Sequence, residues 1–289
     1  MTIIAYFKGH LKAHVHPKLW SQLHYLRYAF RRKAGNIFYP LLGRLVLLNL
    51  KLSRRKKIEN YFARFQIRKL QLGAGSNDLP GWLNSEGFVP SSFTHSLTIA
   101  NNYIYLDVCQ PFPFDDKSFD YIFHEHVVEH LKYHQAQFML QECFRILKPG
   151  GRIRVATPDL QVFVELYGNQ KSPQQELFLS EYVRFNSEVW SADLKHVQNN
   201  HAVFVLNHNF RAWGHQFIYD FSTLADTLES AGFSEVERQL PQRSRDDKLC
   251  GLECRKEVVG IFDALVVEAQ KPQCTAAGNA KINRETSSI

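Results

Sequence analysis

Four histidines and two glutamates lie within eleven residues of the chain, in the stretch HEHVVEHLKYH that runs from His124 to His134. Imidazole and carboxylate groups this close together can bind a divalent metal ion or move protons in catalysis. His126 and His130 are four residues apart, with Glu129 between them, so a helix would place both imidazoles on one face. The chemistry open to this stretch depends on the elements before and after it.

A glycine turn precedes the histidine stretch. The short apolar segment of residues 67–72 runs into Gly73-Ala74-Gly75, and glycines at such a turn let the backbone approach a ligand closely. The third glycine of the dinucleotide-binding fingerprint is missing, since Asp78 stands there. Glu86 lies where a second strand would end, and an acid at that place can accept hydrogen bonds from both ribose hydroxyls.

Strand-like and helix-like segments alternate from about residue 67 to residue 270, which predicts a parallel sheet with crossover helices. A third strand in YIYLDV is expected to end at Asp107, and a fourth covers residues 121–123. An amphipathic helix follows the histidine stretch. Gly150, in LKPGG, is predicted to cap that helix in the left-handed conformation before a fifth strand, RIRVATPD.

Four motifs occur in order along this region: LQLGAGSN, LDVCQPFPFDDKSFDYIF, EHVVEHL and FRILKPGGRIRVATPD. With FSTLADTLESAGFSEVE and DALVVEAQ, they resemble the class I S-adenosylmethionine-dependent methyltransferases of the broad type 11 group, over roughly residues 67–270. The resemblance implies an α/β, Rossmann-like fold with a seven-stranded, mostly parallel sheet whose last strand is antiparallel. It also implies S-adenosylmethionine as the cofactor.

The resemblance further implies a set of cofactor-binding residues: Gly73, Ala74, Gly75, Glu86, Asp107, Val108 and His124. The glycine turn would pass under the methionine part of the cofactor, with Glu86 on the ribose and Asp107 near the adenine amino group. His124 would lie beside the sulfonium. Only ten residues separate Gly75 from Glu86, so the first crossover helix must be shortened or replaced by a loop. The alternative for Glu86 is a surface acid in a loop.

Methyl transfer from a sulfonium needs donor and acceptor in line, and a carbon or hydroxyl acceptor also needs a base. His126 is the first candidate base and His215 the second, while a structural histidine is the alternative for each. A zinc-peptidase interpretation of HVVEH needs a third ligand and a peptidase fold, whereas the flanking motifs belong to another architecture. The sequence therefore predicts no metal site, and Glu129 and His130 are expected to organise the loop through hydrogen bonds.

The acceptor is expected to lie under an insertion at about residues 160–219, which is rich in histidine and aromatic residues. Such a cover suits a small molecule or a sugar or glycan with apolar faces and hydroxyls, and a packed subdomain is the alternative. A nucleic-acid methyltransferase is another interpretation, although HEHV stands where many base methylases carry an NPPY-like sequence. The third is a non-catalytic interaction protein, against which the intact cofactor motifs argue.

Three parts are expected along the chain: a basic helical extension at 1–65, the methyltransferase domain at 66–270 and a disordered tail at 271–289. Residues 1–69 carry sixteen Lys and Arg against one acid, Glu59. This asymmetry points to an anionic partner. Either residues 1–65 make peripheral contact with an anionic membrane, or they form a helical cap with a solvated basic face.

Cysteine usage and hydropathy indicate a cytoplasmic protein. The five cysteines form no CxxC pair, which is typical of a reducing compartment. The opening residues show no secretory signal, and no apolar run reaches the roughly 20 residues that a spanning helix needs. The sequence therefore predicts a cytoplasmic location, with peripheral membrane contact as the variant that the basic extension suggests.

Overall fold

The computed structural model describes residues 48–87, 102–186, 201–255 and 257–273. The chain divides into two compact units, Met1–Arg55 and Lys56–Ile289. Of the first unit only residues 48–55 are described, and they are helical. The predicted membrane contact and most of the basic extension therefore lie outside the described residues, as do residues 274–289 of the tail predicted at 271–289. Its first residue, Lys271, is described and buried. Within the described ranges, no helix is long and apolar enough to cross a membrane.

Residues 56–64 are helical and belong to the second unit, although the sequence suggested a boundary near residue 65. The reason is packing, since Ile58 and Tyr61 are buried in the main core. The Tyr61 hydroxyl also accepts a hydrogen bond from the Lys69 N–H at 2.9 Å, where the first strand begins.

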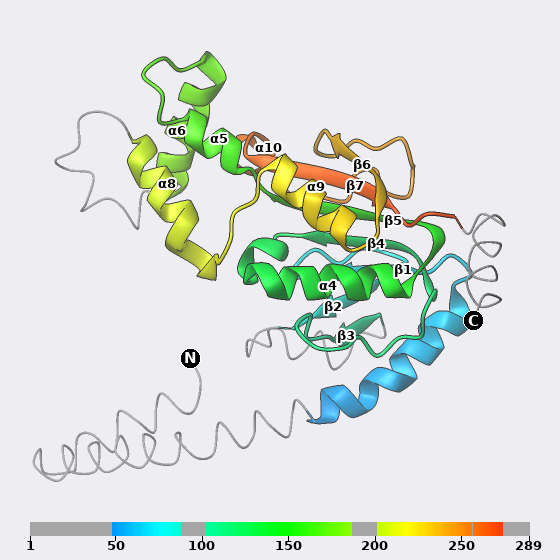
Figure 1. Cartoon of the computed structure of the whole chain (residues 1–289). Helices are drawn as coiled ribbons and strands as arrows, with labels where there is room; N and C mark the ends of the chain where they lie inside the picture. The colour runs from blue at the N-terminus through cyan, green and yellow to red at the C-terminus, as the bar shows by residue number, and fades with distance from the viewer. Residues whose placement is uncertain (1–47, 88–101, 187–200, 256, 274–289) are drawn as a thin grey trace, which may run out of the picture. The chain divides into compact units, whose positions relative to one another are not determined.

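Seven strands form one sheet in the order β3-β2-β1-β4-β5-β7-β6 (Figure 1). Their bounds are β1 Lys69–Leu72, β2 Leu83–Glu86, β3 Tyr103–Tyr105, β4 Phe119–Glu125, β5 Leu147–Pro158, β6 Ser234–Gln239 and β7 Ala264–Gln270. Neighbouring strands from β3 to β5 are parallel, whereas β7 is antiparallel to both β5 and β6. The expected sheet is confirmed. Its strand order reverses at β1 and β4, where ligands bind in such folds.

Helices cover one face of the sheet, and loops contribute to the packing on the other. On the first face lie α4, Tyr133–Ile146, and α9, Phe221–Ser230 (Figure 1). A second cluster of buried residues joins strand residues Phe123 and Val266 to side chains from loops, among them Trp82 and Leu252. Residues 73–82 contain no helix, so the expected short crossover between β1 and β2 is confirmed.

The insertion forms a subdomain at the carboxyl end of β5 (Figure 1). It contains α5 Leu160–Glu165, α6 Pro173–Phe185, α8 Ala202–Arg211 and the 3₁₀ turn η3 Ala212–Gly214. These helices share their own apolar cluster, which includes Phe163, Phe178 and Val205. A packed subdomain was the alternative to an acceptor cover, and the site below shows that these helices also line a cavity.

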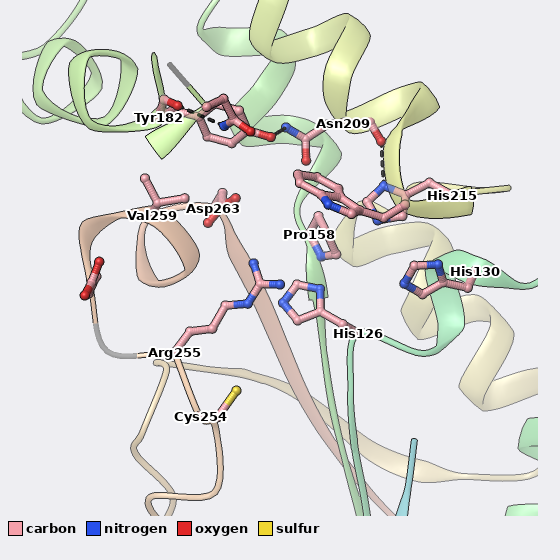
Figure 2. Close-up of a pocket in the computed structure, with 13 residues that line it drawn as sticks. His126, His130, Pro158, Tyr182, Asn209, His215, Cys254, Arg255, Val259 and Asp263 are labelled. Carbon is pink, nitrogen blue, oxygen red and sulfur yellow. Dashed lines mark hydrogen bonds between the residues drawn. The ribbon is translucent and has the colours of Figure 1, made fainter. Parts of the chain in front are cut away.

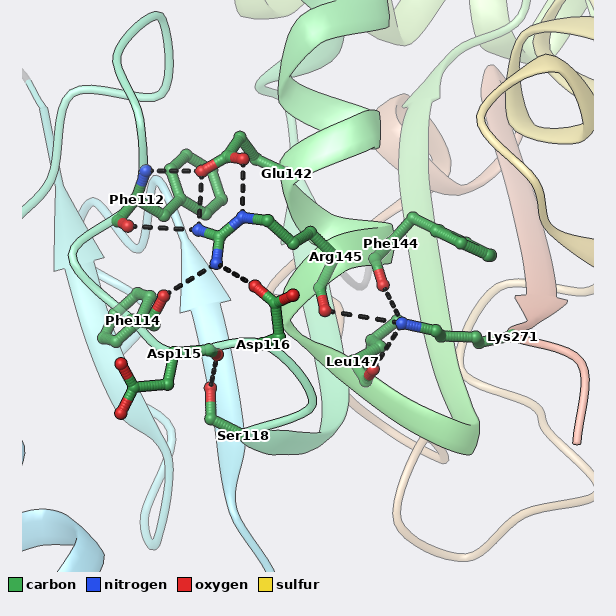
Figure 3. Close-up of polar contacts among 10 residues, drawn as sticks. All are labelled: Phe112, Phe114, Asp115, Asp116, Ser118, Glu142, Phe144, Arg145, Leu147 and Lys271. Carbon is green, nitrogen blue, oxygen red and sulfur yellow. Dashed lines mark hydrogen bonds and ion pairs between the residues drawn. The ribbon is translucent and has the colours of Figure 1, made fainter. Parts of the chain in front are cut away.

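Two cations act at the C-terminal end of α4, as Figure 3 shows. The Arg145 guanidinium donates to the carboxylates of Glu142 and Asp116 at 2.8 Å and to the carbonyls of Phe112 and Phe114. These bonds fix the loop before β4 against the helix. The second cation, on the chain just after β7, caps the last turn of α4.

The prediction that Gly150 caps α4 is wrong. The helix ends at Ile146, with Leu147 extended as its C-cap. The Lys271 ammonium donates to the carbonyls of Phe144 at 2.6 Å and Leu147 at 2.8 Å, so a side chain satisfies these groups instead of a left-handed glycine. Gly150 does have a positive φ of 80°, but it lies within β5.

A buried arginine anchors the loop between β6 and β7. Arg154 of β5 is fully buried, and its guanidinium donates to Glu253 at 2.6 Å and to Glu268 at 2.5 Å. The second oxygen of Glu253 accepts the Gln242 N–H at 2.8 Å. These bonds tie the loop, which also carries Cys254 and Arg255, to strand β5 of the sheet.

We expect Arg154→Ala to lower the free energy of unfolding by about 3–5 kcal/mol, because it leaves buried Glu253 without its cation and Glu268 with only the longer contact to Arg152 at 3.7 Å. Urea denaturation measures this change. Arg184→Ala is the control, since its ion pair with Glu181 is exposed and its loss should leave the unfolding midpoint unchanged. Equal midpoints for both variants would contradict the anchoring role of Arg154.

Candidate functional site

A cavity of about 790 Å³, the first cavity, opens beyond the ends of β1, β2 and β4. Six of the seven cofactor residues expected from the sequence line it: Gly73, Ala74, Gly75, Glu86, Asp107 and Val108. Gly73 and Gly75 have φ values of 59° and 53°, which glycine adopts at little cost. A Cβ on Gly73 would lie 2.4 Å from Cγ2 of Val127, so only glycine fits this close approach.

Two carboxylates stand at the rim of the first cavity, after neighbouring strands. Glu86 is the last residue of β2 and accepts the Gly75 N–H at 3.0 Å, which ties the glycine turn to the strand end. The alternative of a surface acid in a loop therefore does not hold. Asp107 follows β3 by two residues, and its Oδ1 accepts the Cys109 N–H at 3.0 Å.

His124 does not line the first cavity. It lies in β4 on the same side as Ile122, because side chains two apart along a strand share a face, and that side packs into the main core. The imidazole is fully buried, and neither ring nitrogen has a partner within the described residues. Burial lowers the pKa of His124 to about 4. Glu125 and His126, the next residues, line the cavity instead.

The chain turns out of β4 at His126, which has a φ of 53°. The His126 backbone N–H donates a hydrogen bond to the Ala156 carbonyl at 2.9 Å. Its Nδ1 lies 2.6 Å from Oε1 of Glu129, a residue of the 3₁₀ turn η1, Val128–His130. Since a carboxylate accepts, Nδ1 donates this hydrogen bond, and in the neutral form of the ring the lone pair is then on Nε2. The Thr157 hydroxyl donates to the other oxygen of Glu129 at 3.0 Å.

Glu129 is a fully buried carboxylate. Burial alone would raise the pKa of Glu129, but the charge and hydrogen bond of His126 and the nearby His130 lower it to about 2. The side chain is therefore an anion that holds the His126 ring in one orientation. The expectation that Glu129 organises this loop through hydrogen bonds is confirmed; His130 has no side-chain hydrogen bond within the described residues.

A second cavity, of about 660 Å³, adjoins the first. Five residues line both: His126, His130, Trp213, Cys254 and Arg255. Tyr182 and Asn209 of the insertion and Asp263, just before β7, line only the second, and the Arg255 side chain extends toward His126 (Figure 2). Burial raises the pKa of Asp263. No spacing in the sequence pointed to Tyr182, Asn209, Arg255 or Asp263, because they come from segments far apart in the chain.

His215 lines the second cavity, so both candidate bases face the same space. Two backbone hydrogen bonds place it there, since the N–H groups of Gln216 and Phe217 donate to the Glu129 carbonyl at 2.7 and 3.2 Å. The ring centroids of His215 and His130 are 4.9 Å apart. The His215 Nδ1–H donates to the Asn209 carbonyl at 2.5 Å, and burial lowers the pKa of the ring.

Comparisons with known proteins were made at three levels. A family model described as a methyltransferase domain matches residues 91–155. This range contains β3, β4, the histidine stretch, α4 and most of β5. A search of curated proteins found no match.

Solved structures with a similar fold include several methyltransferases. An S-adenosylmethionine-dependent methyltransferase from Thermotoga maritima, a possible histamine N-methyltransferase, is 18% identical with a TM-score of 0.40, and the match covers 84% of this chain and 99% of that one. A second, from Archaeoglobus fulgidus, is 14% identical with a TM-score of 0.43, covering 81% and 100%. Haemonchus contortus phosphoethanolamine N-methyltransferase 2, in complex with S-adenosylmethionine, is 16% identical with a TM-score of 0.38, covering 76% and 53%. Likenesses this distant carry no conclusion about an acceptor.

We expect Gly73→Ala to destabilise the protein more than Gly75→Ala. Both variants force a side chain into the left-handed region, at about 1–2 kcal/mol each. Only Gly73→Ala also drives a Cβ into Val127, which adds about 1–3 kcal/mol, whereas the space beside Gly75 is open. Urea unfolding of the two variants side by side measures the difference, and equal losses would refute the close approach at Gly73.

Proposed function

The chain carries a class I S-adenosylmethionine-dependent methyltransferase domain, and on this premise we propose that it methylates a hydroxyl group of a small-molecule or sugar acceptor. The observation that supports this proposal is the position of His126. Its ring lines both cavities, and its Nδ1–H is held by a buried carboxylate, so the Nε2 lone pair is available where the two spaces meet.

The first cavity fits S-adenosylmethionine, the cofactor of this domain. The Gly73–Gly75 turn offers backbone close to a ligand, and the cavity volume is in the range of cofactor sites. Glu86 and Asp107 offer carboxylates for the ribose hydroxyls and the adenine amino group. When bound, the cofactor would supply an activated methyl group for transfer to an acceptor oxygen, and its sulfur would keep the electron pair of the broken S–C bond.

The second cavity supports a hydroxyl-bearing acceptor. A hydroxyl must lose its proton as its oxygen is methylated, and His126 Nε2 is placed to accept it. Trp213 offers an apolar face, while Asn209 and Asp263 offer hydrogen-bonding groups, a combination that suits a sugar. A nucleic-acid acceptor is less favoured by this lining, since it sets two carboxylates, Glu257 and Asp263, which repel phosphates, against the one guanidinium of Arg255.

We expect Asp107→Asn and Glu86→Gln each to weaken S-adenosylmethionine binding about 10- to 100-fold, because each substitution removes a charged hydrogen-bond acceptor for the cofactor. Asn keeps an acceptor for the Cys109 N–H, so the turn survives in the first variant. Calorimetric titration of the cofactor into purified protein measures the effect. Asp115→Ala is the control, because that exposed acid lines neither cavity. Undiminished affinity in both variants would contradict this placement of the cofactor.

We expect His126→Asn to reduce kcat by about 10²–10⁴ while S-adenosylmethionine affinity stays within about threefold, because a general base acts only in the chemical step. The acceptor is first sought by S-adenosylhomocysteine release with panels of sugars, amines and RNA. His134→Asn, at an exposed position of α4, is the matched control. A His126→Asn enzyme with the wild-type kcat would rule out the base, and turnover with RNA alone would replace the sugar proposal.

A further inference from the structure

Three potential metal ligands converge where the insertion returns to the sheet: Glu129, His130 and His215. One ligand atom from each lies within 4.8 Å of the other two. From the sequence, the pair His126 and His130 lacked a third ligand. The structure instead groups His130 with its neighbour in η1 and with a histidine 85 residues further along the chain. We propose that these three side chains bind one divalent first-row transition-metal ion.

The hydrogen bonds around two of the three groups are those that a metal site needs. Ligating histidines almost always donate their second ring N–H to a carbonyl or carboxylate, and ligating carboxylates are themselves hydrogen-bonded. His215 donates Nδ1–H to the Asn209 carbonyl, which leaves the lone pair of Nε2 free. Glu129 is held by His126 at 2.6 Å and Thr157 at 3.0 Å. A carboxylate has about four lone-pair positions, so these two bonds leave others for an ion.

His130 is the ligand that must move. Bonds of about 2.0–2.2 Å in a tetrahedral site place ligand atoms about 3–3.5 Å apart, closer than the span of the cluster. The His130 side chain accepts or donates no hydrogen bond within the described residues and contacts His215 edge to face. Rotation of this imidazole can therefore bring its ring nitrogen closer to Glu129 and His215 without breaking a hydrogen bond of the described residues.

The ligand types select the class of ion. Two imidazoles and one carboxylate suit zinc, iron, cobalt or nickel, whereas magnesium and calcium prefer oxygen ligands. Three protein ligands leave a coordination position open. His130 lines both cavities and His215 the second, so this position faces the space assigned to the acceptor. The ion would hold an acceptor oxygen there; this role rests on the proposed function, but ion binding does not.

The test uses the full chain without an affinity tag, after treatment with a chelator. Zn²⁺ is titrated by calorimetry and Co²⁺ by its visible absorption, which reports imidazole and carboxylate coordination. We expect one ion per chain, and at least tenfold weaker binding in His130→Ala and in His215→Ala. Thr157→Val should weaken binding about tenfold through the loss of its bond to Glu129. His134→Ala, an exposed histidine of the same stretch, should bind as wild type does.

Two results would overturn the site: no saturable binding of either ion by folded wild type, or binding that both ligand variants retain. Circular dichroism checks folding, and His130→Gln and His215→Gln replace any alanine variant that unfolds. S-adenosylmethionine titration into the same metal-free wild type tests the proposed function separately. Cofactor binding without ion binding removes the metal site alone, whereas ion binding without cofactor binding removes the proposed function and leaves the site.

Discussion

The buried carboxylate of Glu129 is the group on which the site depends. Its side chain accepts hydrogen bonds from His126, just after β4, and from Thr157 of β5. Its backbone carbonyl accepts two more from N–H groups at the end of the insertion. One residue therefore orients a candidate base and also docks the segment that carries His215. A buried anion is tolerated only when it is well hydrogen-bonded, so the stability of Glu129 depends on all of these partners.

Much of the fold could be predicted from the sequence because its signals are local. The glycine turn, the apolar strand segments and the helical spacing of α4 each depend on neighbours in the chain, and the sheet order then follows from the family resemblance. The loop that replaces the first crossover helix was also predictable, since ten residues cannot hold both a helix and a strand. The end of α4 was not, because its cap is Lys271, a residue distant in sequence.

The site was predictable only in part, for the same reason. Six of the expected cofactor residues line the first cavity at strand ends that the motifs locate. His124, in contrast, lies one residue before the cavity-lining Glu125, and a shift of one residue along a strand decides between core and cavity. The lining of the second cavity depends on tertiary contacts. His215 reaches His130 only because two backbone hydrogen bonds join the insertion to η1, and no spacing in the sequence encodes that pairing.

The two cavities share five lining residues, and this has a thermodynamic consequence. A ligand in one space fixes side chains, among them Trp213 and Arg255, that also form the wall of the other. If donor and acceptor occupy the two spaces, as the proposed function has it, this common wall would couple their binding. The coupling free energy would then be the same whichever of the two binds first.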